Sequence, residues 1–183
     1  MTGIVARHRA GLMLALLAGC TLGPPKLAQV EVFRDPSAQI ASQTDVTADR
    51  MAGEWYIRQR FTSETGPVFR MSLGALSDGD LELTDLIGDC IDDVCNEEEV
   101  FVLLKPSGPG RWTPTGPQAL LPDAELWVMW MDFDSRTAAI GTPSGEFGWI
   151  MDKNPTGGGD RITAARDIMD WFGYDVGRLE GVR

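Results

Sequence analysis

The chain has 183 residues, of which 43% are hydrophobic and 23% charged, a globular composition whose length fits one domain. Its formal net charge of −11 repels nucleic acid and anionic lipid headgroups, so we expect no nucleic-acid partner. The only histidine, His8, lies in a segment that we expect to be removed, which excludes histidine-based nucleophiles and histidine-ligated metals from the mature chain.

Residues 1–19 have the features of an export signal. A basic region with Arg7 and Arg9 precedes an apolar run, Ala10 to Leu17, that is too short to span a bilayer. The Leu-Ala-Gly before Cys20 resembles a bacterial lipobox, which implies cleavage before Cys20 and its acylation. The alternative is an ordinary secretory signal beside an incidental cysteine. Thr21 is not the aspartate that retains enterobacterial lipoproteins in the inner membrane, so the resemblance favours an outer-membrane anchor.

Residues 20–44 hold no helical or strand period for long and contain Gly23-Pro24-Pro25 and Asp35-Pro36-Ser37. We therefore predict a tether over 20–44, with Val30, Val32 and Phe33 as residues that could lie against the domain. The folded domain is then expected over residues 45–183.

The first strand is expected to begin at Gly53-Glu54-Trp55, where glycine allows a tight backbone turn. Strict alternation from that point divides the residues between two faces. The mainly apolar face has Trp55, Ile57, Gln59 and Phe61, and the other has Tyr56, Arg58 and Arg60.

Alternating or apolar segments separated by turn signals continue along the chain. The expected strands are Pro67 to Leu76, Leu81 to Asp85, Val100 to Lys105, Arg111 to Thr113, Glu125 to Phe133, Thr137 to Thr142 and Glu146 to Met151. Within Glu125 to Phe133, alternation puts Trp127, Met129 and Met131 on one face and Leu126, Val128 and Trp130 on the other.

One amphipathic helix is expected near the end of the chain. Asp160 is its predicted cap, Gly173 ends it, and its apolar face has Ile162, Ala165, Met169 and Phe172. Val176 to Val182 is a candidate edge strand. About eight antiparallel strands and one helix predict an all-β fold, an eight-stranded up-and-down barrel with the helix packed outside. The interior of such a barrel is filled by side chains or holds one small ligand.

Cys90 and Cys95 form an even pair in an exported chain, which predicts a disulfide. A reactive or metal-binding pair is the alternative. Acidic residues surround the pair: Asp85, Asp89, Asp92, Asp93, Glu97, Glu98 and Glu99. Their spacing does not match a calcium loop, so we expect a charged rim with no metal and no cofactor.

Four places in the chain resemble the bacterial outer-membrane lipoprotein lipocalins. They are the lipobox at Cys20, Gly53-x-Trp55-Tyr56, the two strands from Thr137 to Lys153, and the terminal helix running into Gly173-Tyr174-Asp175. The resemblance implies that the basic side chain of Lys153 packs over Trp55 and closes the barrel beside Gly53. It also implies a lipid-anchored protein, facing the periplasm, that carries a small amphipathic molecule such as a fatty acid or lysophospholipid.

The candidate ligand-lining residues are methionines and aromatics, which suit pliable apolar ligands. They are Phe69, Met71, Trp112, Trp127, Met129 and Met131. Ordinary core packing explains the same residues equally well. Arg58, Arg60 and Arg70 are candidates for meeting a carboxylate or phosphate, against the alternative of solvated strand faces. The alternative function is a non-enzymatic module with a filled barrel that docks on an envelope protein. Enzymatic activity has no support in the sequence.

Overall fold

The computed structural model describes residues 31–61, 70–91, 94–115 and 125–182, with the backbone alone described for 85–91 and 94–100. The signal segment, Cys20 and Phe69 therefore lie outside the described residues. Among the described residues, no helix has the length and apolar character needed to cross a bilayer.

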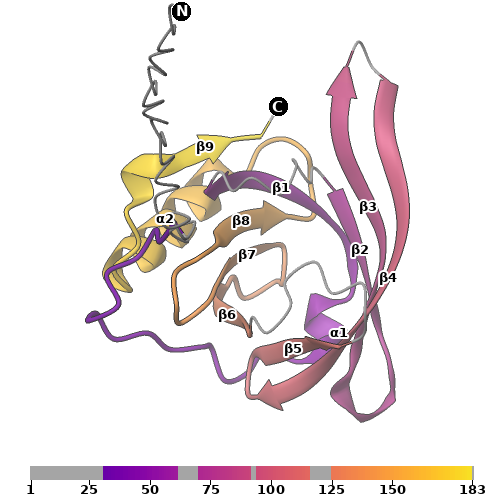
Figure 1. Cartoon of the computed structure of the whole chain (residues 1–183), viewed down its shortest axis with the longest axis horizontal. Coiled ribbons are helices and arrows are strands. Elements are labelled where there is room, and N and C mark those ends of the chain that lie inside the picture. Colours follow the sequence, from indigo (N-terminus) through magenta and orange to yellow (C-terminus); the bar gives the residue numbers. More distant parts are fainter. Residues whose placement is uncertain (1–30, 62–69, 92–93, 116–124, 183) are drawn as a thin grey trace, which may run out of the picture.

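Eight antiparallel strands form a closed barrel, which confirms the predicted fold (Figure 1). The strands are β1 (Gly53–Phe61), β2 (Arg70–Ala75), β3 (Leu81–Ile91), β4 (Val94–Gly108), β5 (Arg111–Thr115), β6 (Leu126–Met131), β7 (Thr137–Gly141) and β8 (Gly148–Asp152). Each strand pairs with the next, and β1 pairs with both β8 and β2 to close the sheet. The ninth strand, β9 (Leu179–Gly181), pairs with the last three residues of β1.

The barrel interior is an apolar cluster to which all eight barrel strands contribute. Its buried members include Trp55, Ile57, Leu73, Leu81, Val102, Trp112, Val128, Ala138 and Met151. A second cluster lies between the outer face of β6 to β8 and the helix α2 (Gly159–Trp171) and includes Met129, Ile150, Ala165, Met169 and Tyr174. The strands are thus apolar on both faces where the helix covers them, because each face meets a separate core.

Register shifts in β1 and β6 change the faces that strict alternation predicts. In β1 the shift falls between Ile57 and Gln59, so Arg60 lies on the interior face and Phe61 on the outside, where it stacks on Phe33 and Tyr174. The face assignment predicted for Gln59, Arg60 and Phe61 was therefore wrong.

In β6 the shift falls between Val128 and Trp130. Trp127, Met129 and Trp130 belong to the outer cluster, while Leu126, Val128 and Met131 belong to the interior. The predicted grouping of Trp127 and Met129 with Met131 was wrong for the same reason. One extra residue at a bulge reverses the face of everything that follows it.

The hairpin of β3 and β4 is longer than expected and extends past the neighbouring strands (Figure 1). Pro106, predicted to end the strand, lies inside β4, at an irregularity in its pairing with β5. Near the far end of the hairpin, Cys90 lies opposite Cys95 in the backbone register. Their side chains lie outside the described residues, so the disulfide stays a prediction.

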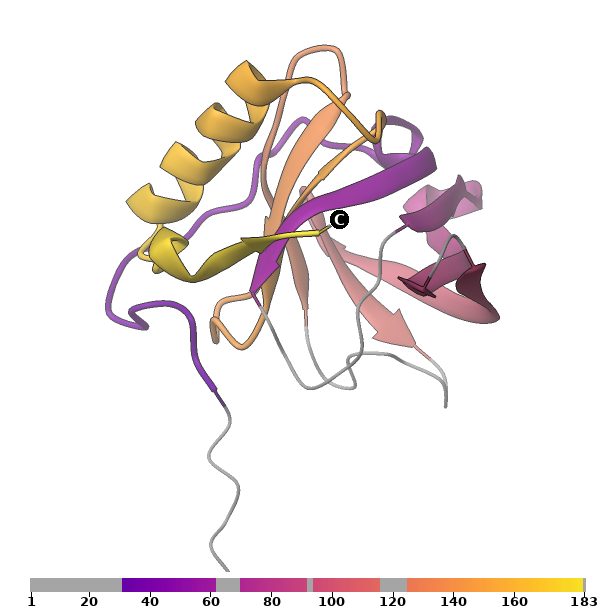
Figure 2. The same cartoon turned by 90° about the horizontal axis from the view of Figure 1, so that it is seen from above.

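The helix α2 lies along the outside of the barrel, and β9 runs beside β1 (Figure 2). The buried face of α2 has Ile162, Ala165 and Met169, as the spacing predicts. The N-cap is Gly158 in the left-handed conformation rather than Asp160, which lies in the first turn. Gly173, with φ +85°, follows the helix as expected.

Tyr174, just after α2, holds the turn between β7 and β8 through its hydroxyl group. Its hydroxyl accepts the Thr142 N–H at 2.8 Å and lies 3.0 and 3.1 Å from the carbonyl oxygens of Thr142 and Phe147. Burial raises the pKa of Tyr174 to about 12, so the hydroxyl stays protonated and keeps its donor function at physiological pH.

Within the segment predicted as a tether, residues 20–44, the described part is packed on the domain from Phe33 onward. Phe33 donates its N–H to Gly145 O and accepts from Asp175 N. The Arg34 side chain is buried, with Nε donating to Phe172 O at 2.7 Å and Nη1 to Pro143 O at 2.9 Å. Arg34 thus supplies donors to the C-terminal end of α2, where carbonyls lack helical partners.

Candidate ligand site in the barrel

The short helix α1 (Ala48–Met51) and the start of β1 close one end of the barrel, which we call the closed end. Trp55 is fully buried there, and its Nε1 donates to Met51 O at 2.6 Å. Val46, Ala48 and Met51 are buried in the same interior cluster. The indole therefore joins the segment before the barrel to its floor.

Lys153, just after β8, lies over this floor. Its Nζ is 5.0 Å from the centroid of the Trp55 ring and donates to Ala52 O at 2.9 Å. Gly53 has φ +117°, and a Cβ there would lie 3.6 Å from Lys153 Nζ. Burial lowers the pKa of Lys153, and the charge of Asp132 partly opposes that effect. The three residues that the family resemblance assigns to barrel closure thus lie together.

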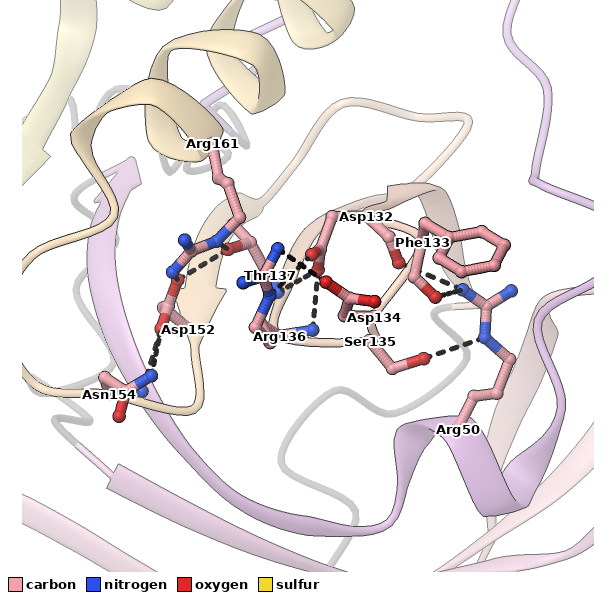
Figure 3. Close-up of polar contacts among 10 residues, drawn as sticks. All are labelled: Arg50, Asp132, Phe133, Asp134, Ser135, Arg136, Thr137, Asp152, Asn154 and Arg161. Atoms are coloured by element: carbon pink, nitrogen blue, oxygen red, sulfur yellow. Dashed lines mark hydrogen bonds and ion pairs between the residues drawn. The ribbon is translucent and has the colours of Figure 1, made fainter.

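A polar network surrounds the outer side of the closed end (Figure 3). Asp152, fully buried, accepts hydrogen bonds from the Thr137 hydroxyl, from Arg161 Nη2 at 2.8 Å and from Asn154 N at 2.8 Å. Burial raises the pKa of Asp152, but these hydrogen bonds outweigh it and the pKa is lowered overall. The carboxylate is thus held ionised by groups that tie the start of α2 to β8.

Asp132, in the β6–β7 turn, belongs to the same network. Its Oδ1 accepts from the backbone N–H groups of Arg136 and Thr137, each at 2.6 Å. Arg50, from α1, donates to Asp132 O at 3.0 Å and to Ser135 Oγ at 2.8 Å. Each carboxylate here is engaged in bonds that hold turns and helices, so the arrangement accounts for structure.

Burial falls along the inner face of β1. Trp55 is 0% and Ile57 3% exposed, whereas Arg60, about 17 Å beyond Trp55 along the strand, is half-buried. Two other half-buried interior residues, Trp149 opposite Arg60 in β8 and Leu126 at the start of β6, lie toward the same end. We call Arg60, Leu126 and Trp149 the upper interior cluster; half-buried Met71 lies deeper, opposite Trp55 in the β1–β2 register.

Two hydrogen-bond donors in the upper interior cluster lack acceptors among the described residues. Trp149 Nε1 is buried without a hydrogen-bond partner. Arg60, directly opposite Trp149 in the β1–β8 register, makes no hydrogen bond or ion pair with any described residue. Leaving a buried donor unsatisfied costs about 1–3 kcal/mol, so an acceptor placed here would be bound favourably.

The sequence-predicted lining residues divide between the two cores. Met71, Trp112 and Met131 contact the interior cluster, and Trp112 Nε1 donates to Gly79 O at 3.0 Å. Trp127 and Met129 lie in the outer cluster, so they do not line the interior. Trp127 instead donates to Glu125 Oε2 at 2.6 Å. The Arg111 guanidinium covers the Trp127 ring, with Cζ 4.8 Å from the ring centroid.

The three candidate arginines have different surroundings. Arg58 is on the outer face and donates to Asn154 O and Gly157 O, and Arg70 pairs with Glu54 at 3.3 Å outside the barrel. Only Arg60 faces inward. Sequence reasoning missed its orientation, since no sequence signal marks the β1 bulge, and it did not include Leu126 and Trp149 among the lining residues. The acidic side chains between 85 and 99 lie outside the described residues.

The comparisons with known proteins agree with this architecture. No protein-family model matches the sequence, and no curated protein does either. Among solved structures, the chain is similar to the major allergen Per a 4 from cockroaches, with 11% identity over 81% of this chain and 95% of that one, and a TM-score of 0.58. It is also similar to apocrustacyanin C1, with 12% identity over 79% and 88% of the two chains and a TM-score of 0.56. Both neighbours are lipocalin-like, and this chain has the lipocalin fold: an eight-stranded antiparallel barrel with one helix outside.

Proposed function

We propose that the protein is a lipid-anchored carrier of the bacterial cell envelope that binds a small amphipathic molecule of the fatty acid or lysophospholipid class inside its barrel. The observation that carries the proposal is the decrease of burial along the inner face of β1 and its neighbour β8. A closely packed floor at Trp55 and Ile57 gives way to half-buried Arg60 and Trp149, with half-buried Leu126 toward the same end. Apolar walls with few polar groups are typical of small-molecule sites.

Ligand binding is tested by titrating delipidated protein with a fluorescent fatty acid and following tryptophan quenching. Trp149 belongs to the upper interior cluster, whereas Trp171 is 82% exposed on α2. We expect saturable quenching that is much reduced in Trp149→Phe and unchanged in Trp171→Phe. The proposal fails if no amphiphile binds saturably, or if both variants quench like the parent protein.

The envelope role rests on the sequence around Cys20, which lies outside the described residues. Acylation of Cys20 would hold the acidic domain at a membrane surface whose headgroups it otherwise repels, and we assign it to the periplasmic side of the outer membrane. The Cys20→Ala variant is expected to move from the membrane fraction to the soluble fraction and to lose incorporation of labelled fatty acid. An unchanged membrane fraction would exclude the anchor.

A second candidate function is a non-enzymatic module that docks on an envelope protein and holds no ligand. It is favoured by the close packing of the interior, where Ile57, Val128, Ile140 and Met151 are each 3% exposed or less, although Ile140 is the register partner of Trp149. If side chains fill the upper part as well, the titration shows no saturable binding, and a salt-sensitive protein partner would be recovered through the acidic surface.

A further inference from the structure

The upper interior cluster pairs an arginine with an indole N–H on the inner wall. Arg60 and Trp149 are direct partners in the antiparallel β1–β8 register. Side chains of such partners lie on the same face with Cβ atoms about 5 Å apart. On β8, Met151 is buried in the interior cluster and Trp149, two residues away, packs against the same cluster. This face of β8 is therefore the inner one, and Arg60 shares it as the register partner of Trp149. Two donors therefore point into the barrel side by side.

Neither donor is engaged by the described part of the protein. Trp149 Nε1 is buried without an acceptor, and the Phe147 ring stacks on the Trp149 indole at 5.5 Å between centroids, which restrains its orientation. The guanidinium of Arg60 has no partner among the described residues, in contrast to Arg58, which donates to two backbone carbonyls. Within the described residues, the interior face thus has two adjacent donors that no acceptor of the fold engages.

The charges around the pair limit what it accepts. Glu180, on β9, lies opposite Arg60 in the register but is exposed, and no ion pair joins the two. The pair has one positive charge, on Arg60, and one uncharged donor, the indole N–H, which matches a ligand with one negative charge spread over two oxygens. A second negative charge would be repelled by Glu180.

We propose that Arg60 and Trp149 form the head-group site of the barrel, in which the guanidinium and the indole N–H bind the two oxygens of a monoanionic head while the chain extends toward Met71 and Leu126. This inference rests on the proposed function and deepens it. The same oxygen chemistry is offered by a fatty-acid carboxylate and by the phosphodiester of a lysophospholipid.

The test compares three probes on delipidated full-length protein: a long-chain fatty acid, the fatty alcohol of equal chain length and a lysophosphatidylcholine with the same acyl chain. Dissociation constants are measured by calorimetry for the parent protein, Arg60→Gln, Trp149→Phe and the control Arg58→Gln, which removes the same charge from the outer face of the same strand. A melting curve of each variant establishes that it is folded.

We expect the acid to bind the parent protein at least about tenfold more tightly than the alcohol, and Arg60→Gln to remove that difference by weakening the acid alone. Trp149→Phe should weaken the acid severalfold, and Arg58→Gln should change neither. The lysophospholipid follows the acid if its phosphate uses the pair and follows the alcohol if the carboxylate is the matched head.

Two outcomes overturn the inference in distinguishable ways. If acid and alcohol bind equally well to the parent protein and to Arg60→Gln, the barrel binds ligands but the head-group site is wrong. If no probe binds the parent protein, the proposed function fails and the inference fails with it. The Glu180→Gln variant gives a further check. If Arg60 only stabilised the fold through Glu180, Arg60→Gln and Glu180→Gln would lower the melting temperature equally and leave the binding of the fatty acid unchanged.

Discussion

At the scale of single residues, Trp55 holds the closed end together through three kinds of contact. Its ring is fully buried among interior residues, its N–H is bound by Met51 O, and Lys153 Nζ covers one face. The cation–ring contact contributes about 0.5–2 kcal/mol, less than the burial of an indole. Packing should therefore dominate the effect of any substitution at Trp55.

Trp55→Ala is expected to lower the free energy of unfolding by about 3–5 kcal/mol, because it leaves a cavity and orphans Met51 O. Lys153→Met keeps the aliphatic cover and removes the charge, so its cost should be about 1–2 kcal/mol. Chemical denaturation measures both, with Trp171→Ala as a control of similar size change on an exposed residue. A midpoint for Trp55→Ala equal to that of the control would show that this residue does not close the barrel.

At the scale of elements, the sequence predicts which segments are strands better than which way their side chains point. The strand that starts near Trp55, the turn at Asp78-Gly79 and the spacing of Ile162, Ala165 and Met169 are local signals, and all three were confirmed, although the alternation of β1 holds only as far as Ile57. The bulges near Arg58 and Met129 depend on how β1 meets β8 and how β6 meets β7, which no local pattern records. Only the β1 bulge turns Arg60, one of the three candidate arginines, toward the interior.

The attachment of α2 to the barrel shows the same dependence on long-range contacts. Asp152 on β8 joins Arg161 on α2 and Thr137 on β7. The spacing of residues in the sequence does not predict that these three elements meet. The N-cap glycine, Gly158, offers no side-chain cap, so this interaction is what fixes the first turn. The ion pair and the hydroxyl are therefore part of the helix attachment.

Asp152→Asn is expected to lower the free energy of unfolding by about 2–4 kcal/mol at pH 7, since it leaves Arg161 without its buried counter-charge. The folded state lowers the pKa of Asp152, so its stabilisation is present above the unfolded pKa of about 3.9 and is lost as pH falls through the folded value. Denaturation at pH 7 and pH 3 should show the gap between parent and variant narrowing in acid. The exposed helix position Asp167→Asn provides the matched control, and a gap that stays constant with pH would contradict the assignment.

At the scale of the whole molecule, the segment before β1 connects the two ends of the barrel. Phe33 and Arg34 bind the β7–β8 turn and the end of α2, and Gln43 then donates its N–H to Val128 O on β6. Thr47, which caps α1, brings the chain to the closed end. The segment therefore couples the helix, the outer sheet face and the floor, although its composition suggested only a tether.

This coupling predicts a sharp boundary for truncation. A chain that starts at Glu31 retains these contacts. A chain that starts at Gln39 lacks Phe33, which stacks on Phe61, and lacks Arg34, which donates to the carbonyls of Phe172 and Pro143. We expect the shorter chain to lose at least about 3 kcal/mol in urea denaturation, the cost of removing one buried aromatic side chain. Hydrogen exchange should locate the loss at the last turn of α2 and at the β7–β8 turn, with the floor around Trp55 still protected. Equal midpoints for the two chains would mean that residues 31–38 lie on the barrel without stabilising it, and the domain would then begin where the sequence alone puts it, at residue 45.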